Sequence, residues 1–312
     1  MVLIISYCKA HRFGEAEMIY GKSIELFLVN GTADSLITAE LSNWNGKAIK
    51  IPRIEISSCK RDDITQAGVY FLFCKEDDGT DSVYIGEAEN VRERLLQHLR
   101  DYQVEKEKYY WTTAVIFIGR DLNKALIRYL ENRFVDIARQ CKRYSVLTKN
   151  TYRNTVMKES QIAVMEEFID NVKILINALG YKVLEPLNKP VIADENENIN
   201  IDKEEIQLYL ERTIKGVGKI DAEGLRTSEG FVVLSGSHMA PEADDTVSAG
   251  IKDQRNKAKV VDGILQEDVL FSSPSGAAMF VVGKSANGLT SWKNAEGITL
   301  KDIENNEAGG NC

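Results

Sequence analysis

Two short apolar runs with a turn signal between them, within residues 68–86, constrain the fold of this chain more than any other feature. The first run, GVYFLFC, alternates β-branched and aromatic residues, and the second run, VYIG, follows a DDG sequence at 77–79. Strand-forming runs separated by an Asp-Gly turn are typical of a β-hairpin. Antiparallel pairing of the two runs then places Tyr70 and Tyr84 on neighbouring strands.

A helical pattern, NVRERLLQHL, begins shortly after the hairpin. Arg94 and His98 are four residues apart in it, so they share one face of the predicted helix. We therefore expect two tyrosines, an arginine and a histidine to converge on one small surface. Side chains of these types suit cleavage of a phosphodiester, where the attacking water needs a proton acceptor and the phosphate needs charge neutralisation.

The triads GVY at 68–70 and YIG at 84–86, with the residues after them, resemble the GIY-YIG nuclease family. GVY differs from GIY by one methylene, and NVRERLLQH matches the family's Arg- and His-bearing helix. A later helix of the family carries a metal-binding Glu, matched here in LNKALIRYLENRFVDIARQ, and a final Asn is matched after KRYSVLTK. The resemblance covers about residues 66–155 and implies a catalytic set of Tyr70, Tyr84, Arg94, His98, Glu131 and Asn150.

The resemblance also assigns each residue a part in hydrolysis. Glu131 would hold one divalent cation, Mg²⁺ or Mn²⁺, because hard cations prefer carboxylate and phosphate oxygens. Arg94 presents a planar fork of donors to a phosphate. By family resemblance Tyr70 deprotonates water, which requires positive charge nearby to lower a phenol pKa of about 10. His98 is the other candidate base, and Tyr84 positions water or phosphate.

Ordinary structural roles account for each of these residue types taken singly. A strand tyrosine is usually packed in a core, and a helical arginine is usually solvated or ion-paired. Glu131 is more informative, because it lies beside rather than opposite the apolar stripe of its predicted helix. The order of the whole set favours a functional site. The stripe comprises Leu122, Leu126, Leu130, Phe134 and Ile137.

The 312-residue chain carries a formal net charge of −8, but for nucleic-acid binding the distribution of charge matters more than its sum. Residues 139–158 contain six basic residues and no acid, whereas residues 159–211 contain twelve acids and four lysines. The basic segment follows the predicted Glu131 helix, where a phosphate backbone would pass. The predicted DNA-binding residues are Arg92, Lys142, Arg143, Lys149 and Arg153.

Changes of pattern along the chain predict the α/β (α+β) class and four parts. Period-two alternation marks strands, helical spacing marks helices, and a polar acidic stretch marks a linker. The parts are a small β-rich module (1–62), the nuclease (63–182), an acidic linker (183–222) and a C-terminal α+β domain (223–305). Within the nuclease we expect strands near 68–74, 82–85 and 113–118, and helices near 90–101, 121–140 and 158–180.

The last part contains FSSPSGAA and VVGKSANGLTSWKN, and resembles the small uncharacterised domain commonly fused to the end of GIY-YIG proteins. It is also similar to a module of some adenine methylases and restriction enzymes that has been proposed to read DNA. We expect the Asn287-Gly288 turn to present Trp292. A small domain whose Ser and Trp residues are only structural is the alternative.

Composition narrows the classes of protein to which the chain can belong. No stretch approaches twenty apolar residues, so no membrane span is predicted. Five cysteines without CxxC spacing indicate a reducing cytoplasm and argue against disulfide or zinc frameworks. We therefore expect a cytoplasmic, metal-dependent endonuclease acting on DNA, which cuts both strands only as a homodimer or in two encounters. The alternative is a non-catalytic DNA-binding or assembly protein with a residual nuclease fold; RNA is a less favoured substrate.

Overall fold

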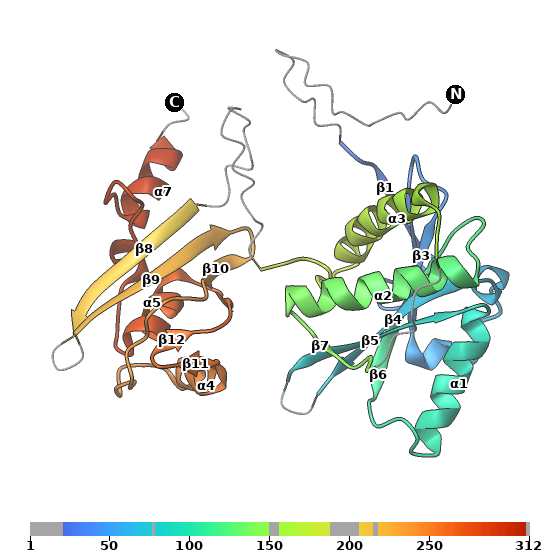
Figure 1. Ribbon diagram of the computed structural model, residues 1–312, viewed down its shortest axis with the longest axis horizontal. Coiled ribbons are helices and arrows are strands. Elements are labelled where there is room, and N and C mark those ends of the chain that lie inside the picture. The colour runs from blue at the N-terminus through green and yellow to red at the C-terminus, as the bar shows by residue number, and fades with distance from the viewer. Residues whose placement is uncertain (1–20, 77–78, 150–155, 188–205, 215–217, 310–312) are drawn as a thin grey trace, which may run out of the picture. The chain divides into compact units, whose positions relative to one another are not determined.

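The computed structural model describes residues 21–76, 79–149, 156–187, 206–214 and 218–309. The chain divides into two compact units, Met1–Pro186 and Leu187–Cys312, each with its own sheet and helices (Figure 1). Both units combine helices with mainly antiparallel strands, which confirms the predicted α+β class.

A seven-stranded sheet forms the centre of the first unit, in the order β1-β2-β3-β6-β4-β5-β7. Neighbouring strands are antiparallel, except that β5 and β7 are parallel. The three strands predicted within residues 63–182 are present as β4, β5 and β6. The strands are β1 (Ile24–Leu28), β2 (Ile37–Leu41), β3 (Lys47–Pro52), β4 (Gly68–Lys75), β5 (Asp81–Ala88), β6 (Trp111–Ile118) and β7 (Ser145–Val146).

Strands β1–β3 belong to this same sheet, so the prediction of a separate module over residues 1–62 is corrected. β3 pairs along its whole length with β6, from Lys47 opposite Ile118 to Pro52 opposite Thr113. The alternating pattern identifies the three strands, but it carries no information about which distant strand they pair with. The boundary predicted at residue 62 therefore lies inside a single folded unit.

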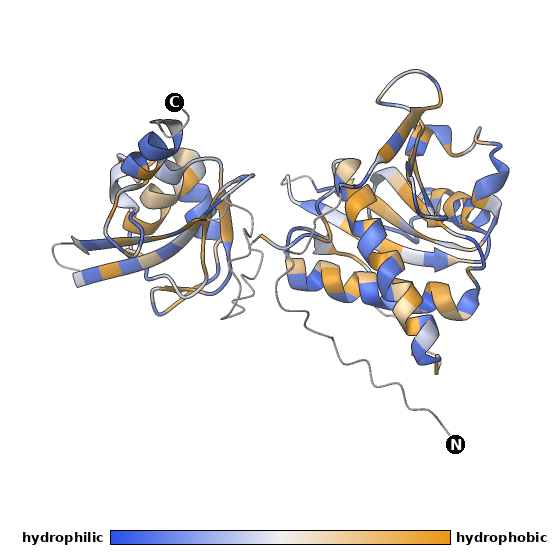
Figure 2. Ribbon diagram, turned by 90° about the horizontal axis from the view of Figure 1, so that it is seen from above, coloured by the Kyte–Doolittle hydropathy of each residue, from blue (hydrophilic) through white to orange (hydrophobic). Residues whose placement is uncertain are grey.

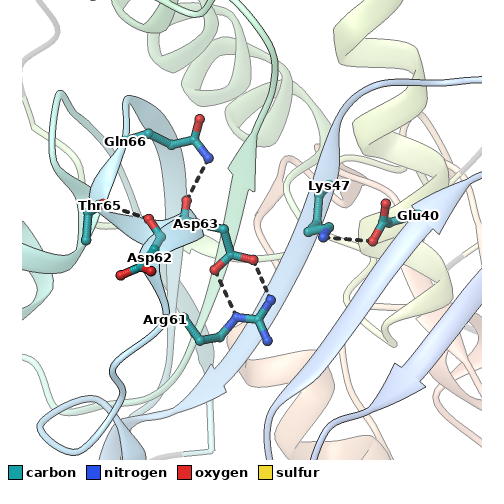
Figure 3. A network of polar contacts seen from close by, with 7 residues as sticks. All are labelled: Glu40, Lys47, Arg61, Asp62, Asp63, Thr65 and Gln66. Atoms are coloured by element: carbon teal, nitrogen blue, oxygen red, sulfur yellow. Dashed lines mark hydrogen bonds and ion pairs between the residues drawn. The ribbon is translucent and has the colours of Figure 1, made fainter.

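The connection across that boundary is held by short-range polar contacts (Figure 3). Arg61 forms a two-pronged ion pair with Asp63, in which Nε lies 2.9 Å from Oδ1. Gln66 Nε2 donates to the Asp63 carbonyl over 2.9 Å, and Thr65 Oγ1 donates to the Asp62 carbonyl over 2.6 Å. These residues form and follow the 3-10 turn η2 (Asp62–Thr65), which leads the chain from η1 (Arg53–Glu55) into β4.

Three helices cover the sheet, and the first two begin at an asparagine cap. Asn90 Oδ1 accepts the backbone N–H of Glu93 over 3.1 Å, and Asn123 Oδ1 accepts two backbone N–H groups of the first turn after it. All three helices predicted within residues 63–182 are confirmed. They are α1 (Val91–Gln103), α2 (Lys124–Cys141) and α3 (Glu159–Ala178).

The side chains of β4 alternate between two cores on opposite faces of the sheet. Val69, Phe71 and Phe73 pack in the core that includes α2 and α3, whereas Tyr70 and Leu72 pack in the core that includes α1. Figure 1 shows α2 and α3 on one side of the sheet and α1 on the other. Burial on both faces explains the nearly continuous apolar run of this strand. It also assigns Tyr70 to the α1 side.

The second unit is built on a four-stranded antiparallel sheet in the order β13-β10-β9-β8. Strands β11 and β12, which precede β13 in the chain, form a separate two-stranded antiparallel sheet. Its strands are β8 (Ile206–Ile214), β9 (Gly218–Thr227), β10 (Gly230–Val233), β11 (Val260–Val261), β12 (Ile264–Leu265) and β13 (Val269–Phe271). Its helices are α4 (Ala249–Lys257), α5 (Pro274–Val282), α6 (Gly288–Ser291) and α7 (Leu300–Gly309).

Strand β8 and the first half of β9 occupy residues that the sequence predicted as linker, so the boundary at 222 is corrected. The two strands pair over nine residues and place charged side chains such as Glu211 and Lys219 on the solvent side. Lys219 Nζ lies 3.0 Å from Glu211 Oε1. Because one face of this hairpin is exposed to solvent, its sequence contains many polar residues and resembles a linker. Residues 188–205 of the predicted linker lie outside the described residues.

Trp292 lies at the centre of the second core rather than on a presenting turn, which corrects that expectation. Its side chain is fully buried, its Nε1 donates to the Pro274 carbonyl over 3.0 Å, and its ring lies 4.6 Å from that of Phe231. Figure 2 shows hydrophobic and hydrophilic residues interleaved along the strands and helices of both units, as expected for elements with one buried and one solvated face.

Candidate active site

The β4–β5 hairpin brings the two predicted tyrosines together. Tyr70 pairs opposite Gly86 and Tyr84 pairs opposite Leu72, so the tyrosines are diagonal neighbours on one face. Their rings lie 6.3 Å apart with an interplanar angle of 28°. The predicted pairing is therefore confirmed, while two aspartates of the predicted turn, at 77–78, lie outside the described residues.

Gly86, the last residue of the second triad, provides the space for the Tyr70 hydroxyl. A Cβ built at Gly86 would lie 2.5 Å from the Tyr70 oxygen and 2.9 Å from the ring of Tyr84, closer than atoms pack. Only glycine leaves this side of β5 open without displacing a tyrosine. The triad is thus required by packing at the same point where the chemistry is expected.

Helix α1 delivers Arg94 and His98 to the same tyrosine, as the four-residue spacing predicts. His98 Nε2 lies 2.9 Å from the Tyr70 oxygen, and Arg94 Nε donates to that oxygen over 3.3 Å. The His98 side chain has no exposed surface. Burial, opposed by the hydrogen bond that His98 donates to Glu107 and assisted by the charge of Arg94, lowers the pKa of His98. His98 is therefore a neutral ring behind Tyr70.

Two residues of the segment between α1 and β6 complete this cluster, and sequence reasoning missed both. Glu107 Oε1 lies 2.5 Å from His98 Nδ1. The ring of Tyr109 stacks on that of Tyr84 at 5.6 Å. The sequence signal that was available is the spacing of Glu107 and Tyr109, two residues apart just before a strand, which places them on one side of extended chain.

Glu131 lies on α2 with one carboxylate oxygen unpaired. It is buried, and its Oε2 has no hydrogen-bond partner among the residues that the structure describes. Burial and the neighbouring Glu87 raise the pKa of Glu131 to about 7, against the opposing charges of Lys124 and Arg128. An anionic oxygen in this position costs free energy unless a cation or a proton satisfies it.

Glu87, by contrast, is already neutralised. Lys124 Nζ lies 2.7 Å and 2.8 Å from its two carboxylate oxygens, and Arg128 Nε lies 3.8 Å from one of them. Glu87 also has only 5% of its side chain exposed. Of these two neighbouring carboxylates, Glu131 is the one left available to a ligand.

An open cavity of about 840 Å³ joins these groups. Tyr70, Tyr84, Arg94 and Glu131 all line it, so four of the predicted catalytic residues meet at one hollow between α1, α2 and β5. His98 stands behind Tyr70 instead of lining it. The cations of this cavity are ones that the sequence did not select as DNA-binding: Arg100, Lys124 and Arg128, together with Arg94.

The predicted DNA-binding residues have other places in the structure. Arg92 Nε donates to the Cys59 carbonyl over 2.9 Å, and Arg143 donates to the carbonyls of Glu185 and Pro186. These hydrogen bonds give both residues a structural role, and their assignment as DNA contacts stays a prediction. None of the described members of the set lines the cavity. The set further comprises Lys142 at the end of α2, the exposed Lys149, and Arg153, which lies outside the described residues.

Asn150 also lies outside the described residues. The segment before it runs beside β5, because the Thr148 hydroxyl donates to the Ile85 carbonyl over 2.7 Å and accepts the Ile85 N–H over 2.9 Å. Leu147 N–H donates to the Val83 carbonyl over 2.8 Å. Thr148 is thereby tied to the middle residue of the second triad.

The donor set fits a hard divalent cation with most of its shell supplied by water. Mg²⁺ in proteins is usually bound by one or two carboxylates and keeps several water ligands. The unpaired Glu131 oxygen could supply such a carboxylate ligand. In the described part of the chain there is no group of three or more His, Cys, Asp or Glu residues that would enclose a metal ion. A fully protein-coordinated metal centre is therefore not built by the described residues.

Comparison with known proteins adds one match, in the second unit. Residues 213–304 match a family described as a domain of unknown function (DUF4357). The match confirms an uncharacterised C-terminal domain, and it begins within β8, ahead of the predicted start at 223. No curated protein and no solved structure matches the chain. No helix among the described residues is long and apolar enough to cross a membrane.

Proposed function

We propose that the first unit is a metal-dependent endonuclease of the GIY-YIG type that hydrolyses phosphodiester bonds in DNA, and that the C-terminal domain reads DNA. The observation that carries the proposal is the hydrogen-bonded set of Tyr70, Arg94 and His98 at the wall of a cavity that Glu131 also lines. This set combines a proton acceptor, a fork of donors and a carboxylate, the three needs of phosphodiester hydrolysis.

Glu131 would hold the cation, which when bound neutralises phosphate charge as the bond breaks. Arg94 lines the cavity, and the donors of its guanidinium beyond Nε bind a phosphate oxygen. Tyr84 lines the same wall and orients water or phosphate. The remaining cations, Lys124 and Arg128, stand on α2 beside Glu131 and balance the charge of the bound strand.

Tyr70 takes the proton of the attacking water in this proposal. Burial and the neighbouring Tyr84 raise the pKa of Tyr70, although the charge of Arg94 opposes them. A standing phenolate is therefore disfavoured. Tyr70 accepts a proton only as its own proton leaves, and His98 Nε2 is the atom placed to receive it.

A non-catalytic DNA-binding or assembly protein is the second candidate. A cavity lined with four cations would serve binding alone. Binding does not need a buried carboxylate with an unpaired oxygen, however, because such a group repels phosphate and lowers stability. The presence of Glu131 among these cations favours the enzyme.

Cleavage of supercoiled plasmid with and without Mg²⁺ or Mn²⁺ tests the proposal. We expect wild-type protein to nick the plasmid only with metal, and Glu131→Ala to lose this activity. Glu167→Ala, which removes an exposed carboxylate from α3, is the matched control and should cut at the wild-type rate. Failure of the wild type to cut either unmodified or methylated plasmid at any metal concentration would favour the binding protein.

The form of the product reports on assembly. One site with one metal cuts one strand, so a monomer should produce nicked circles first. Linear product appearing without a nicked intermediate would indicate two sites acting together, as in a homodimer. The concentration dependence of that product, measured beside the sedimentation of the protein, distinguishes a dimer from two successive encounters.

A further inference from the structure

Four side chains form one continuous line of hydrogen bonds behind the cavity. Arg94 Nε meets the Tyr70 oxygen at 3.3 Å, the Tyr70 oxygen meets His98 Nε2 at 2.9 Å, and His98 Nδ1 meets Glu107 Oε1 at 2.5 Å. The line runs from a helix through a strand and back to the helix, and it ends in the segment before β6. Its inner members, Tyr70 and His98, are both buried, and Glu107 at one end has 14% of its side chain exposed.

The two ends of the line determine where the protons lie between them. A guanidinium can only donate and a carboxylate can only accept. Arg94 therefore donates to the Tyr70 oxygen, and Glu107 accepts from His98 Nδ1. In a neutral ring the proton on Nδ1 leaves Nε2 unprotonated, so Nε2 accepts the Tyr70 hydroxyl proton.

A charged His98 is the arrangement that would break this order, because both of its nitrogens would donate. Burial lowers the pKa of His98 and the adjacent charge of Arg94 acts in the same direction, which favours the neutral ring despite Glu107. The other titratable groups around the ring are Asp101, Tyr70 and Tyr84. The charge of Asp101 acts with Glu107 to raise the pKa of His98. Burial raises the pKa values of Tyr70 and Tyr84, so both tyrosines are neutral donors.

We propose that Glu107 is a positioning residue that holds His98 in the Nδ1-protonated form, so that Nε2 accepts the proton of Tyr70 during catalysis. This inference rests on the proposed nuclease function and makes Tyr70 and His98 act in series. It also places Glu107 beside the histidine and not beside the substrate, since Glu107 does not line the cavity.

During hydrolysis one proton moves from water to Tyr70 and another from Tyr70 to His98. The attacking water gives one proton to the Tyr70 oxygen while the Tyr70 proton passes to His98 Nε2, and the hydroxide oxygen forms a bond to phosphorus. The bond from phosphorus to the leaving oxygen breaks, and that oxygen takes a proton from solvent. His98 is then a cation held against Glu107, and it returns its proton through Tyr70 to water after the product leaves.

The ring tautomer tests the proposal without any activity. The chain contains three histidines, so the ¹⁵N signals of His98 are assigned by comparing labelled wild type with His98→Asn. We expect His98 at neutral pH to show a protonated Nδ1 and an unprotonated Nε2, and Glu107→Leu to replace this by a mixture of tautomers. A protonated Nε2 in the wild type, with either state of Nδ1, would overturn the assignment.

The rate of cleavage tests the same residue during turnover. Glu107→Gln keeps the shape of the side chain and removes its charge, and we expect kcat to fall by about 10²-fold with KM unchanged. Glu105→Gln, in the same segment but exposed, is the control and should retain wild-type kcat. An unchanged kcat in Glu107→Gln would refute the positioning role. Absence of wild-type cleavage would refute the proposed function separately, because the tautomer result does not depend on it.

Discussion

At the scale of single residues, the site depends on side chains that are absent or unpaired as much as on those that make contacts. Gly86 leaves room for the Tyr70 hydroxyl, and Glu131 keeps one oxygen without a partner among the described residues. Both features cost stability in general, because glycine loses backbone entropy on folding and a buried unpaired anion loses hydration. Each therefore leads to a measurable expectation.

Gly86→Ala should lower both stability and cleavage. The added Cβ would lie 2.5 Å from the Tyr70 oxygen in a packed interior, and such overpacking costs about 1–3 kcal/mol. Gly250→Ala, on a helix with open space around it, is the control and should be neutral or slightly stabilising. Urea unfolding measures both variants; equal midpoints for Gly86→Ala and wild type would show that the tyrosine moves aside freely.

Glu131 should make the metal-free protein less stable as pH rises. Its pKa is raised from 4.5 in the unfolded chain to about 7 in the fold, so the folded state holds the proton more tightly. The stability contribution is complete below pH 4.5 and is lost as pH rises to about 7, and a shift of this size corresponds to at most about 3–4 kcal/mol.

Denaturant unfolding of wild type and Glu131→Gln at pH 5 and pH 8 checks this sign. From pH 5 to pH 8 we expect the free energy of unfolding to fall more for the wild type than for Glu131→Gln. Mg²⁺ should restore part of the stability that the wild type loses at pH 8, because it binds the carboxylate. A difference between the two proteins that is the same at both pH values would contradict the raised pKa.

At the scale of elements, helix α1 carries two arginines in different surroundings. Arg100 is exposed on α1 and lines the cavity, whereas Arg92 on the same helix is hydrogen-bonded to the Cys59 carbonyl. The DNA-binding residues predicted from the sequence include Arg92 and not Arg100. The direction in which each side chain leaves the helix, and what it meets there, follows only from how α1 docks on the sheet.

Arg100→Gln should weaken DNA binding, whereas Arg92→Gln should lower stability. Removing one phosphate contact reduces the slope of log affinity against log salt by about 1, uniformly across sequences. Loss of the Cys59 contact costs about 1 kcal/mol and leaves the affinity unchanged. Fluorescence anisotropy at several salt concentrations and urea unfolding, each applied to both variants, make the comparison; reversed effects would restore Arg92 as a DNA contact.

At the scale of the whole molecule, the first unit is a single folding unit that includes its first three strands. β3 supplies the partner for one edge of β6, and residues of β2 such as Ala39 and Leu41 lie in the same core as α3. The core of the second unit shares no residue with the two cores of the first. Each unit therefore has its own basis for stability.

Truncated chains test this division. Residues 1–186 should express as a soluble protein with one cooperative unfolding transition, because the unit retains its complete sheet. Residues 63–186 should not fold, since removing β3 leaves an edge of β6 unpaired and takes Ala48, Ile49 and Ile51 out of the two cores. Circular dichroism and thermal unfolding report the outcome, and a cooperative transition in the shorter chain would support an independent N-terminal module after all.

The hairpin, the three helices of the first unit and the sharing of one helix face by Arg94 and His98 follow from the sequence alone, because each is set by a period or a turn within a short segment. The meeting of that face with Tyr70 depends on how α1 docks on the sheet. Tertiary structure decided the rest: the pairing of β3 with β6, the position of Glu107 beside His98, and the unpaired oxygen of Glu131. These depend on contacts between residues distant in the chain, and burial, which sets pKa values and leaves atoms without partners, exists only once those contacts form.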